Sequence, residues 1–381
     1  MNAENGALDM DCNSIYLPYG DGASFSGFRK EPWPVPGKPG QNLTFRGLNN
    51  LDAAIEFAMT NGMAEATEVV ITGVSAGGLS AFLHMDRIAD RVRVDSPHAK
   101  VRGAPVVGFF LDHENYANNS ATSYKAEMHY LFRMQNLSFG ATGGMTEACQ
   151  IKHPSQPWLC FMSPHMFDVI QTPLFVFNSR FDAFQLGAIL QLSSWPTADK
   201  QHAVIEYGAD FLTTFAPLQA IAKHGAFIST CICHSCDWST LTLEGKTAFQ
   251  HYEAWYEGSA TGAAAMHVDL RMPNGGGTIS DPLCAKFPTE KHKCLLINYF
   301  RFAVMSSAPP ALLGRRRPVV HLTMFSVFSL HSVFSQVRQW QRVGWGSAAG
   351  VSCTVVTPLH GAGSHAPRPS EGKRDVRENG G

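Results

Sequence analysis

The sequence predicts an α/β fold in which a mostly parallel sheet is covered by helices on both faces. Short apolar or β-branched runs alternate along the chain with longer segments whose apolar residues recur every three or four positions. One such run, residues 68–72, leads into Gly-Val-Ser-Ala-Gly at residues 73–77, and a helical pattern follows at once. Because strands and helices alternate, we expect a parallel sheet whose functional side chains follow the carboxyl ends of its strands.

The predicted strands are short apolar segments bounded by turn residues. The first precedes a glycine-containing loop, the second carries the β-branched run before the serine, and the last ends at Cys233 and His234. The strands are expected at residues 14–19, 69–72, 101–111, 173–178 and 226–232.

The predicted helices are segments with one apolar face. In the first helix, Leu48, Leu51, Ile55 and Met59 share a face, and Gly62 follows its end. A short helix is expected after residue 182. The longer helices are expected at residues 48–59, from residue 76 onward, and at 120–137, 211–223 and 244–257.

Composition and charge exclude several classes of function. The 381 residues are 45% hydrophobic with a formal net charge of −1, which is typical of a folded protein and not of a nucleic-acid-binding one. The apolar run at 318–334 is too short and too polar to predict a membrane span. The first residues lack the basic and apolar regions of a signal peptide.

The cysteines and glycosylation motifs point to an oxidising compartment. Nine cysteines are present, and Asn42, Asn118 and Asn136 each begin an Asn-X-Ser/Thr motif. We expect disulfides or buried thiols. A zinc site is the alternative, because the cysteine-rich segment also contains a histidine, although its spacing departs from the usual knuckle. The candidate zinc ligands are Cys231, Cys233, His234, Cys236, His292 and Cys294.

Three residues form a candidate catalytic set. Ser75 lies at the apex of the predicted strand–turn–helix, and the Ala76 and Gly77 amides beside it are expected to stabilise an oxyanion. Asp182 and His234 also follow predicted strands, in the order nucleophile, acid, histidine that is typical of the α/β-hydrolase fold. An ordinary capping or solvated aspartate and a surface or core histidine are the alternatives for the last two.

Several collinear segments of the chain resemble the pectin acetylesterases of plants and their animal relative Notum. Residues 19–27 are similar to the family's Tyr-Cys-Asp-Gly-Ala-Ser-Phe block, although Gly20 replaces the cysteine, and residues 73–78 resemble its serine elbow. Residues 178–185 resemble the segment of the acid, and residues 227–234 that of the histidine. Further similar segments lie at residues 45–47, 108–112, 149–160 and 173–175.

The resemblance implies a secreted serine carboxylesterase that needs no metal or organic cofactor. Ser75 would attack the ester, His234 would transfer the proton, and Asp182 would orient the imidazole. O-acetyl groups of a polysaccharide such as pectin are the expected substrate. The alternatives are a Notum-like protein O-deacylase, a catalytically inactive carbohydrate- or ligand-binding relative, and a zinc-stabilised interaction domain.

The resemblance also sets the expected domain boundaries. It covers about residues 10–294, and the domain is expected to span residues 10–300, whereas residues 301–381 match nothing in the family and are expected to form a largely disordered tail. Family members carry an upstream Gly-Gly-Gly-Trp-type segment that supplies part of the oxyanion hole. We expect the chain to begin after that segment and the sheet to lack its first strands.

Overall fold

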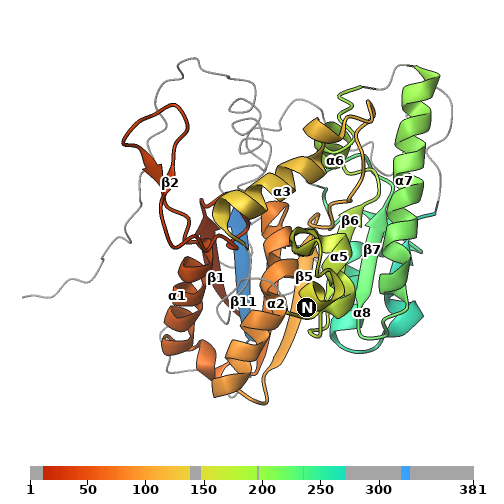
Figure 1. Ribbon diagram of the computed structural model, residues 1–381. Helices are drawn as coiled ribbons and strands as arrows, with labels where there is room; N and C mark the ends of the chain where they lie inside the picture. The colour runs from red at the N-terminus through yellow and green to blue at the C-terminus, as the bar shows by residue number, and fades with distance from the viewer. Residues whose placement is uncertain (1–11, 138–146, 195–196, 235, 271–318, 327–381) are drawn as a thin grey trace, which may run out of the picture. The chain divides into compact units, whose positions relative to one another are not determined.

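A seven-stranded sheet forms the centre of the protein (Figure 1). The structure is a computed structural model that describes residues 12–137, 147–194, 197–234, 236–270 and 319–326. The strand order of the sheet is β1-β11-β4-β5-β6-β7-β10, and every neighbouring pair is parallel. The strands are β1 (Cys12–Tyr19), β4 (Glu68–Val74), β5 (Lys100–Val106), β6 (Phe175–Ser179), β7 (Gly225–Ser229), β10 (Met266–Val268) and β11 (Val319–Ser326). The predicted α/β class is confirmed.

Eight α-helices, five short 3-10 helices and two short hairpins complete the described part of the chain. The helices are α1 (Gly47–Thr60), α2 (Ala76–Asp95), α3 (Tyr124–Gln135), α4 (Glu147–Lys152), α5 (Ser163–Met166), α6 (Ala183–Ala188), α7 (Ala198–Gln219) and α8 (Ala248–Tyr256). The hairpins pair β2 (Trp33–Pro34) with β3 (Asn42–Leu43) and β8 (Thr242–Leu243) with β9 (Lys246–Thr247). Among the described residues, no helix combines the length and the apolarity that crossing a membrane requires.

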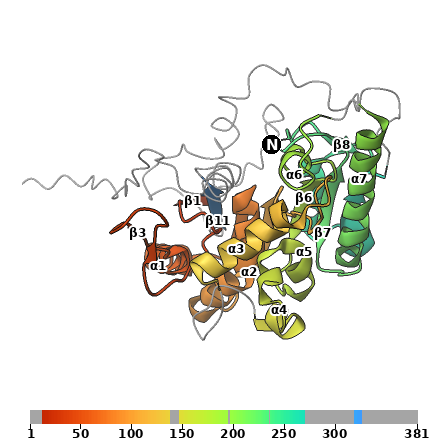
Figure 2. The same cartoon turned by 45° about the horizontal axis from the view of Figure 1, so that its top comes forward.

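The sheet separates two apolar cores, as side-chain alternation along a strand requires. In β4, Val69 and Ile71 join the larger core, which also contains residues of α1, α2, α3 and α7. Val70 joins the smaller core on the opposite face, where α8 packs with Tyr252 and Trp255. Figures 1 and 2 show α1, α2 and α3 together over one face of the sheet.

Several boundaries differ from those expected, for local reasons. The strand predicted at residues 101–111 ends at Val106, because Val107 takes a positive φ of 44° and turns the chain. Helix α7 begins upstream of the predicted residue 211, because Val204 and Tyr207 extend its buried stripe. Strand β7 ends at Ser229, so His234 lies on the following loop.

The helix predicted at residues 244–257 is partly a hairpin. Glu244 and Gly245, with φ of 54° and 78°, form the turn between β8 and β9. Helix α8 begins only at Ala248, after a capping box in which Thr247 and Gln250 satisfy each other's backbone amides.

Strand β11 lies beyond the domain boundary expected near residue 300. It pairs with β1 on one side and with β4 on the other, and Val320, Leu322 and Met324 are buried. Residues 319–326 therefore have to be counted with the sheet and not with the tail. Apart from residues 319–326, the tail expected at residues 301–381 lies outside the described residues.

Candidate active site

The candidate nucleophile lies on a tight turn between β4 and α2. Ser75 is the N-cap residue of α2 and has φ 58° and ψ −120°, a conformation that costs a non-glycine residue on the order of 1–3 kcal/mol. The turn is held by hydrogen bonds from the Ser75 amide to the Val106 carbonyl (3.0 Å) and from the Leu79 amide to the Ser75 carbonyl (2.9 Å). The predicted strand–turn–helix arrangement is therefore present.

The glycines beside Ser75 are required by close backbone packing. A Cβ on Gly73 would lie 2.2 Å from the Gly77 carbonyl oxygen. A Cβ on Gly78 would lie 2.4 Å from the Val106 carbonyl oxygen. Both atoms belong to the backbone and cannot move aside as a flexible side chain would, so the sequence motif reflects the geometry of the turn.

Asp182 follows β6 and is completely buried. Its Oδ1 accepts hydrogen bonds from the amides of Phe184 (2.9 Å) and Gln185 (3.1 Å), which makes it the N-cap of α6. The same carboxylate lies 2.8 and 2.9 Å from Nδ1 of His234. The Asp182 side chain thus both caps helix α6 and lies in position to orient His234.

His234 connects the acid to the serine. Its Nδ1 faces Asp182, and its Nε2 lies 2.7 Å from the Ser75 Oγ. Because an ionised carboxylate only accepts hydrogen bonds, Nδ1 carries the proton and Nε2 presents its lone pair to the serine hydroxyl. The structure therefore brings together all three residues that the sequence analysis selected.

The oxyanion candidates are the amides at the start of α2. Ala76 and Gly77 occupy the first two positions of the helix, whose N–H groups have no intrahelical acceptor. Ser24, on the loop after β1, donates to the Ala76 carbonyl (3.0 Å) and so fastens that loop to the first turn. Asp21 accepts bonds from the Ala23 and Phe25 amides within the same loop, and burial raises the pKa of its carboxyl.

Sequence reasoning did not assign the polar residues that hold the neighbouring loop at 107–112. Asn178 accepts from the Phe109 amide, and Gln185 accepts from the Leu111 amide and donates to the Phe109 carbonyl. The signal was only their place in a segment that resembles the family. The loop carries Phe110, whose ring, with that of Phe184, flanks the His234 imidazole at centroid distances of 6.4 and 5.2 Å.

Disulfides occupy the cysteine-rich segment. Cys233 is bonded to Cys236, so one disulfide brackets His234, and Cys231 is disulfide-bonded as well. Because these sulfurs are not thiolates and both nitrogens of His234 are engaged, the described part of the segment offers no zinc ligands. A second disulfide joins Cys149 to Cys160. His292 and Cys294 lie outside the described residues.

Relatives of the chain have names that describe ester hydrolysis. It is 28% identical over 249 residues to pectin acetylesterase 11 of Arabidopsis thaliana, which covers 61% of this chain and 59% of the relative. It is 27% identical over 252 residues to the palmitoleoyl-protein carboxylesterase Notum of Drosophila melanogaster, covering 64% of this chain and 35% of the relative. The chain thus spans less than two thirds of either relative.

A solved structure shares the fold. The Wnt deacylase Notum from Drosophila, at 1.9 Å, superposes with a TM-score of 0.55 and 22% identity, covering 65% of this chain and 68% of that one. A family model described as Pectinacetylesterase matches residues 3–277. That match extends over more than half of the sequence and includes the elbow, the acid loop and the histidine loop. The chain therefore belongs to the pectinacetylesterase family.

Proposed function

We propose that this chain is a serine carboxylesterase that hydrolyses O-acyl esters. The observation that carries the proposal is the continuous hydrogen-bond chain from the buried Asp182 carboxylate through His234 to the Ser75 hydroxyl. A serine hydroxyl is a weak nucleophile at neutral pH, and an oriented imidazole is what activates it. The names of the relatives, which describe acyl-ester hydrolysis, support the same reaction class.

The proposed reaction has two halves. Ser75 Oγ attacks the ester carbonyl carbon while His234 Nε2 takes its proton, and the alkoxide of the substrate then leaves with that proton. Water, deprotonated by His234, then attacks the acyl-serine; the bond to Ser75 Oγ breaks, His234 returns the proton to Oγ, and the carboxylic acid is released. In both halves the Ala76 and Gly77 amides stabilise the negative oxygen, and Asp182 stabilises the imidazolium without itself being protonated.

The first-choice substrate is an O-acetylated polysaccharide such as pectin. Pectin acetylesterases of Arabidopsis support this choice. A protein O-deacylase is the second candidate, and the likeness to Notum supports it. The two differ in acyl length, so the dependence of the reaction rate on acyl chain length separates them.

A chain-length series tests the proposal. Nitrophenyl acetate, butyrate, octanoate and palmitate are offered to the purified full chain and to Ser75→Ala. We expect kcat/KM to be highest for the acetate ester. In a second assay, we expect the enzyme to release acetate from acetylated pectin. Highest kcat/KM for the long acyl chains would select the protein deacylase instead. No hydrolysis of any ester would leave the inactive binding relative as the correct description.

We also propose that the chain follows the secretory route. The Cys149–Cys160 and Cys233–Cys236 disulfides support an oxidising compartment. The asparagines of all three glycosylation motifs, Asn42, Asn118 and Asn136, are exposed. A mass shift on treatment with a peptide N-glycosidase, for protein expressed in eukaryotic cells, is the expected result.

A further inference from the structure

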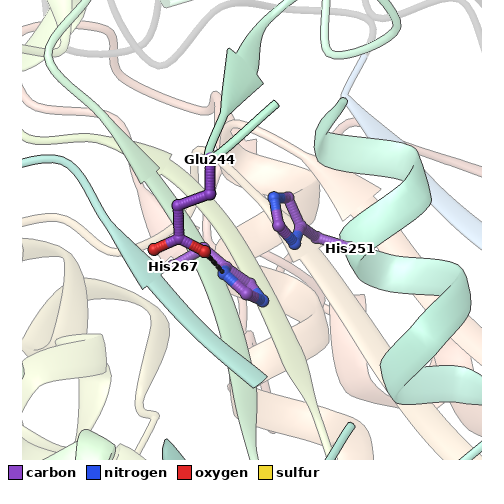
Figure 3. Close-up of side chains that lie close together, drawn as sticks. All are labelled: Glu244, His251 and His267. Carbon is purple, nitrogen blue, oxygen red and sulfur yellow. Dashed lines mark hydrogen bonds and ion pairs between the residues drawn. The ribbon is translucent and has the colours of Figure 1, made fainter. Parts of the chain in front are cut away.

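A second cluster of chemically active side chains lies apart from the serine site, in the segment that follows the histidine loop (Figure 3). It contains Glu244 from the β8–β9 turn, His251 from α8 and His267 from β10. One donor atom from each residue lies within 4.8 Å of those of the other two. Within the described residues it is the one group of at least three histidine, cysteine or acidic side chains gathered so closely.

We propose that Glu244, His251 and His267 bind a divalent transition metal ion of the zinc class. Two imidazoles and one carboxylate are ligands that Zn²⁺ accepts, with water in the remaining position. Imidazole nitrogen also distinguishes this site from calcium and magnesium sites, which are built from oxygen ligands. These residues are separate from the cysteines that the sequence suggested as zinc ligands.

The hydrogen bonds of the two histidines fix which nitrogen is available to a metal. His251 Nε2 lies 2.9 Å from the Leu243 carbonyl oxygen, which only accepts, so Nε2 carries the proton and Nδ1 has the free lone pair. His267 Nδ1 lies 3.0 Å from the Glu244 carboxylate. A metal ion between them would replace the proton of this hydrogen bond and take Nδ1 and a carboxylate oxygen as two of its ligands. A backbone carbonyl on the other ring nitrogen, as in His251, is a usual companion of a metal-binding imidazole.

Burial favours neutral, metal-binding rings. His251 and His267 are only 3% and 8% exposed, and their ring centroids are 3.5 Å apart. Metal-binding imidazoles are neutral, and burial disfavours the charged imidazolium form.

The backbone conformation of the turn directs the Glu244 carboxylate toward His267. Glu244 has φ 54°, in a two-residue turn where asparagine or glycine is the usual choice. This conformation places its carboxylate over His267 (Figure 3). Donor atoms around tetrahedral zinc are about 3.3 Å apart, as follows from metal–ligand bonds of about 2 Å. Closing the site therefore requires the donor atoms, which lie within 4.8 Å of one another, to approach by up to about 1.5 Å.

A bound ion would fasten three elements to one another. It would tie the turn at Glu244 and helix α8 to β10, which forms one edge of the sheet in the described part of the chain. The turn at Glu244 lies at the end of the segment that runs from His234 to Glu244. We therefore infer a structural role, in which the ion stabilises this end of the fold.

Zinc and cobalt binding to the full chain test the inference. Chelator-treated protein is dialysed against ZnCl₂ and analysed for bound metal, and CoCl₂ is added to a second sample. One equivalent of zinc, and the visible bands of four-coordinate Co²⁺, are the expected results. Zinc at 100 times its Kd would also raise the folded-to-unfolded ratio about 100-fold, which appears as a higher Tm.

Two variants and one control assign the ligands. Glu244→Gln alters an exposed side chain, and His267→Gln keeps an amide donor toward Glu244, so circular dichroism should show an unchanged fold. Each should weaken zinc binding by at least about tenfold. The control is His202→Gln, which alters the exposed His202–Glu206 pair on α7 and should leave binding unchanged.

The same measurements can overturn the inference. Absence of bound zinc in the folded wild-type protein would refute it. Equal zinc binding by wild type, Glu244→Gln and His267→Gln would refute it as well. Loss of binding in His202→Gln alone would show that the metal sits on the exposed pair of α7.

Discussion

Two histidines of this protein, His234 and His267, have the same first partner and different second partners. In both, Nδ1 lies close to a carboxylate, at 2.8 Å from Asp182 and at 3.0 Å from Glu244. The distal nitrogen of His234 meets the Ser75 hydroxyl, whereas the ring of His267 lies against that of His251. The carboxylate–histidine pair is thus common to both sites, and the third group decides between proton transfer and metal binding.

The two carboxylates also differ in how firmly they are held. The side chain of Asp182 is 0% exposed and caps α6, whereas that of Glu244 is 65% exposed on a two-residue turn. A buried carboxylate that also accepts two backbone hydrogen bonds keeps an imidazole in one orientation, which catalysis requires. An exposed acid can rotate to meet a metal ion. This difference makes the two sites separately testable.

The largest effect should come from the serine. Ser75→Ala removes the proposed nucleophile and should lower kcat for ester hydrolysis by about 10⁴- to 10⁶-fold. The side chain becomes smaller at the turn, so an unchanged melting temperature is expected. Zinc binding is the internal control, because it should remain at one equivalent. A variant that still hydrolyses esters at the wild-type rate would show that Ser75 is not the nucleophile.

The matched acid substitutions should have opposite consequences. Asp182→Asn leaves a capping oxygen but favours the wrong histidine tautomer, so kcat should fall by about 10³- to 10⁴-fold. Glu244→Gln should change kcat by less than about twofold, because its histidine has no part in the proposed reaction. Steady-state kinetics on one acetyl ester measures both. Equal losses would mean that the two carboxylate–histidine pairs are not distinct in function.

A third histidine, His84, has no carboxylate partner and should act on stability alone. It is completely buried, its Nε2 bonds the Ser24 carbonyl, and its Nδ1 has no hydrogen-bond partner among the described residues. Desolvation lowers its pKa to about 4 from 6.5. The unfolded chain therefore binds the extra proton between pH 6.5 and 4, and stability is lost as the pH falls through that range.

Urea unfolding at several pH values measures this loss. The shift corresponds to about 3 kcal/mol between pH 7 and pH 4. His84→Gln keeps a donor for the Ser24 carbonyl and removes the titration, so its stability should depend less on pH. Identical pH slopes for the wild type and the variant would contradict the assignment.

The smallest predicted effect is the change in stability when a Cβ is added to Gly73, in the turn that carries Ser75. Gly73→Ala would force a Cβ against the Gly77 and Met324 carbonyl oxygens and should lower the free energy of unfolding by about 1–3 kcal/mol. Gly187→Ala is the matched control. A Cβ there meets nothing within 4 Å, and helix α6 should be stabilised by roughly 0.5–1 kcal/mol. Chemical denaturation of both variants checks the sign of each change.

The candidate serine site could be predicted from the sequence because a simple rule connects its parts. Ser75, Asp182 and His234 each follow a strand, and parallel strands bring their carboxyl ends to one edge of the sheet. Residues that act through tertiary contacts left no such signal. Asn178 and Gln185, which hold the loop at 107–112, bond to backbone groups more than 60 positions away in sequence.

The fold was predicted where the pattern is local and missed where pairing is long-range. Strand β11 lies between β1 and β4, but its sequence shows only an apolar run, and its place in the sheet follows from strands hundreds of residues upstream. The hairpin at residues 242–247 was missed because a glutamate, and not asparagine, begins its turn. The same unusual residue belongs to the proposed metal site.

Labelling with a fluorophosphonate probe tests the central claim most directly. The probe reacts with a serine only when a neighbouring base activates the hydroxyl, so it reports the Ser75–His234–Asp182 arrangement without requiring knowledge of the substrate. Mass spectrometry of the labelled protein should place the adduct on Ser75, and Ser75→Ala should not be labelled. An unlabelled wild-type protein, or an adduct that persists in Ser75→Ala, would contradict the proposed serine esterase.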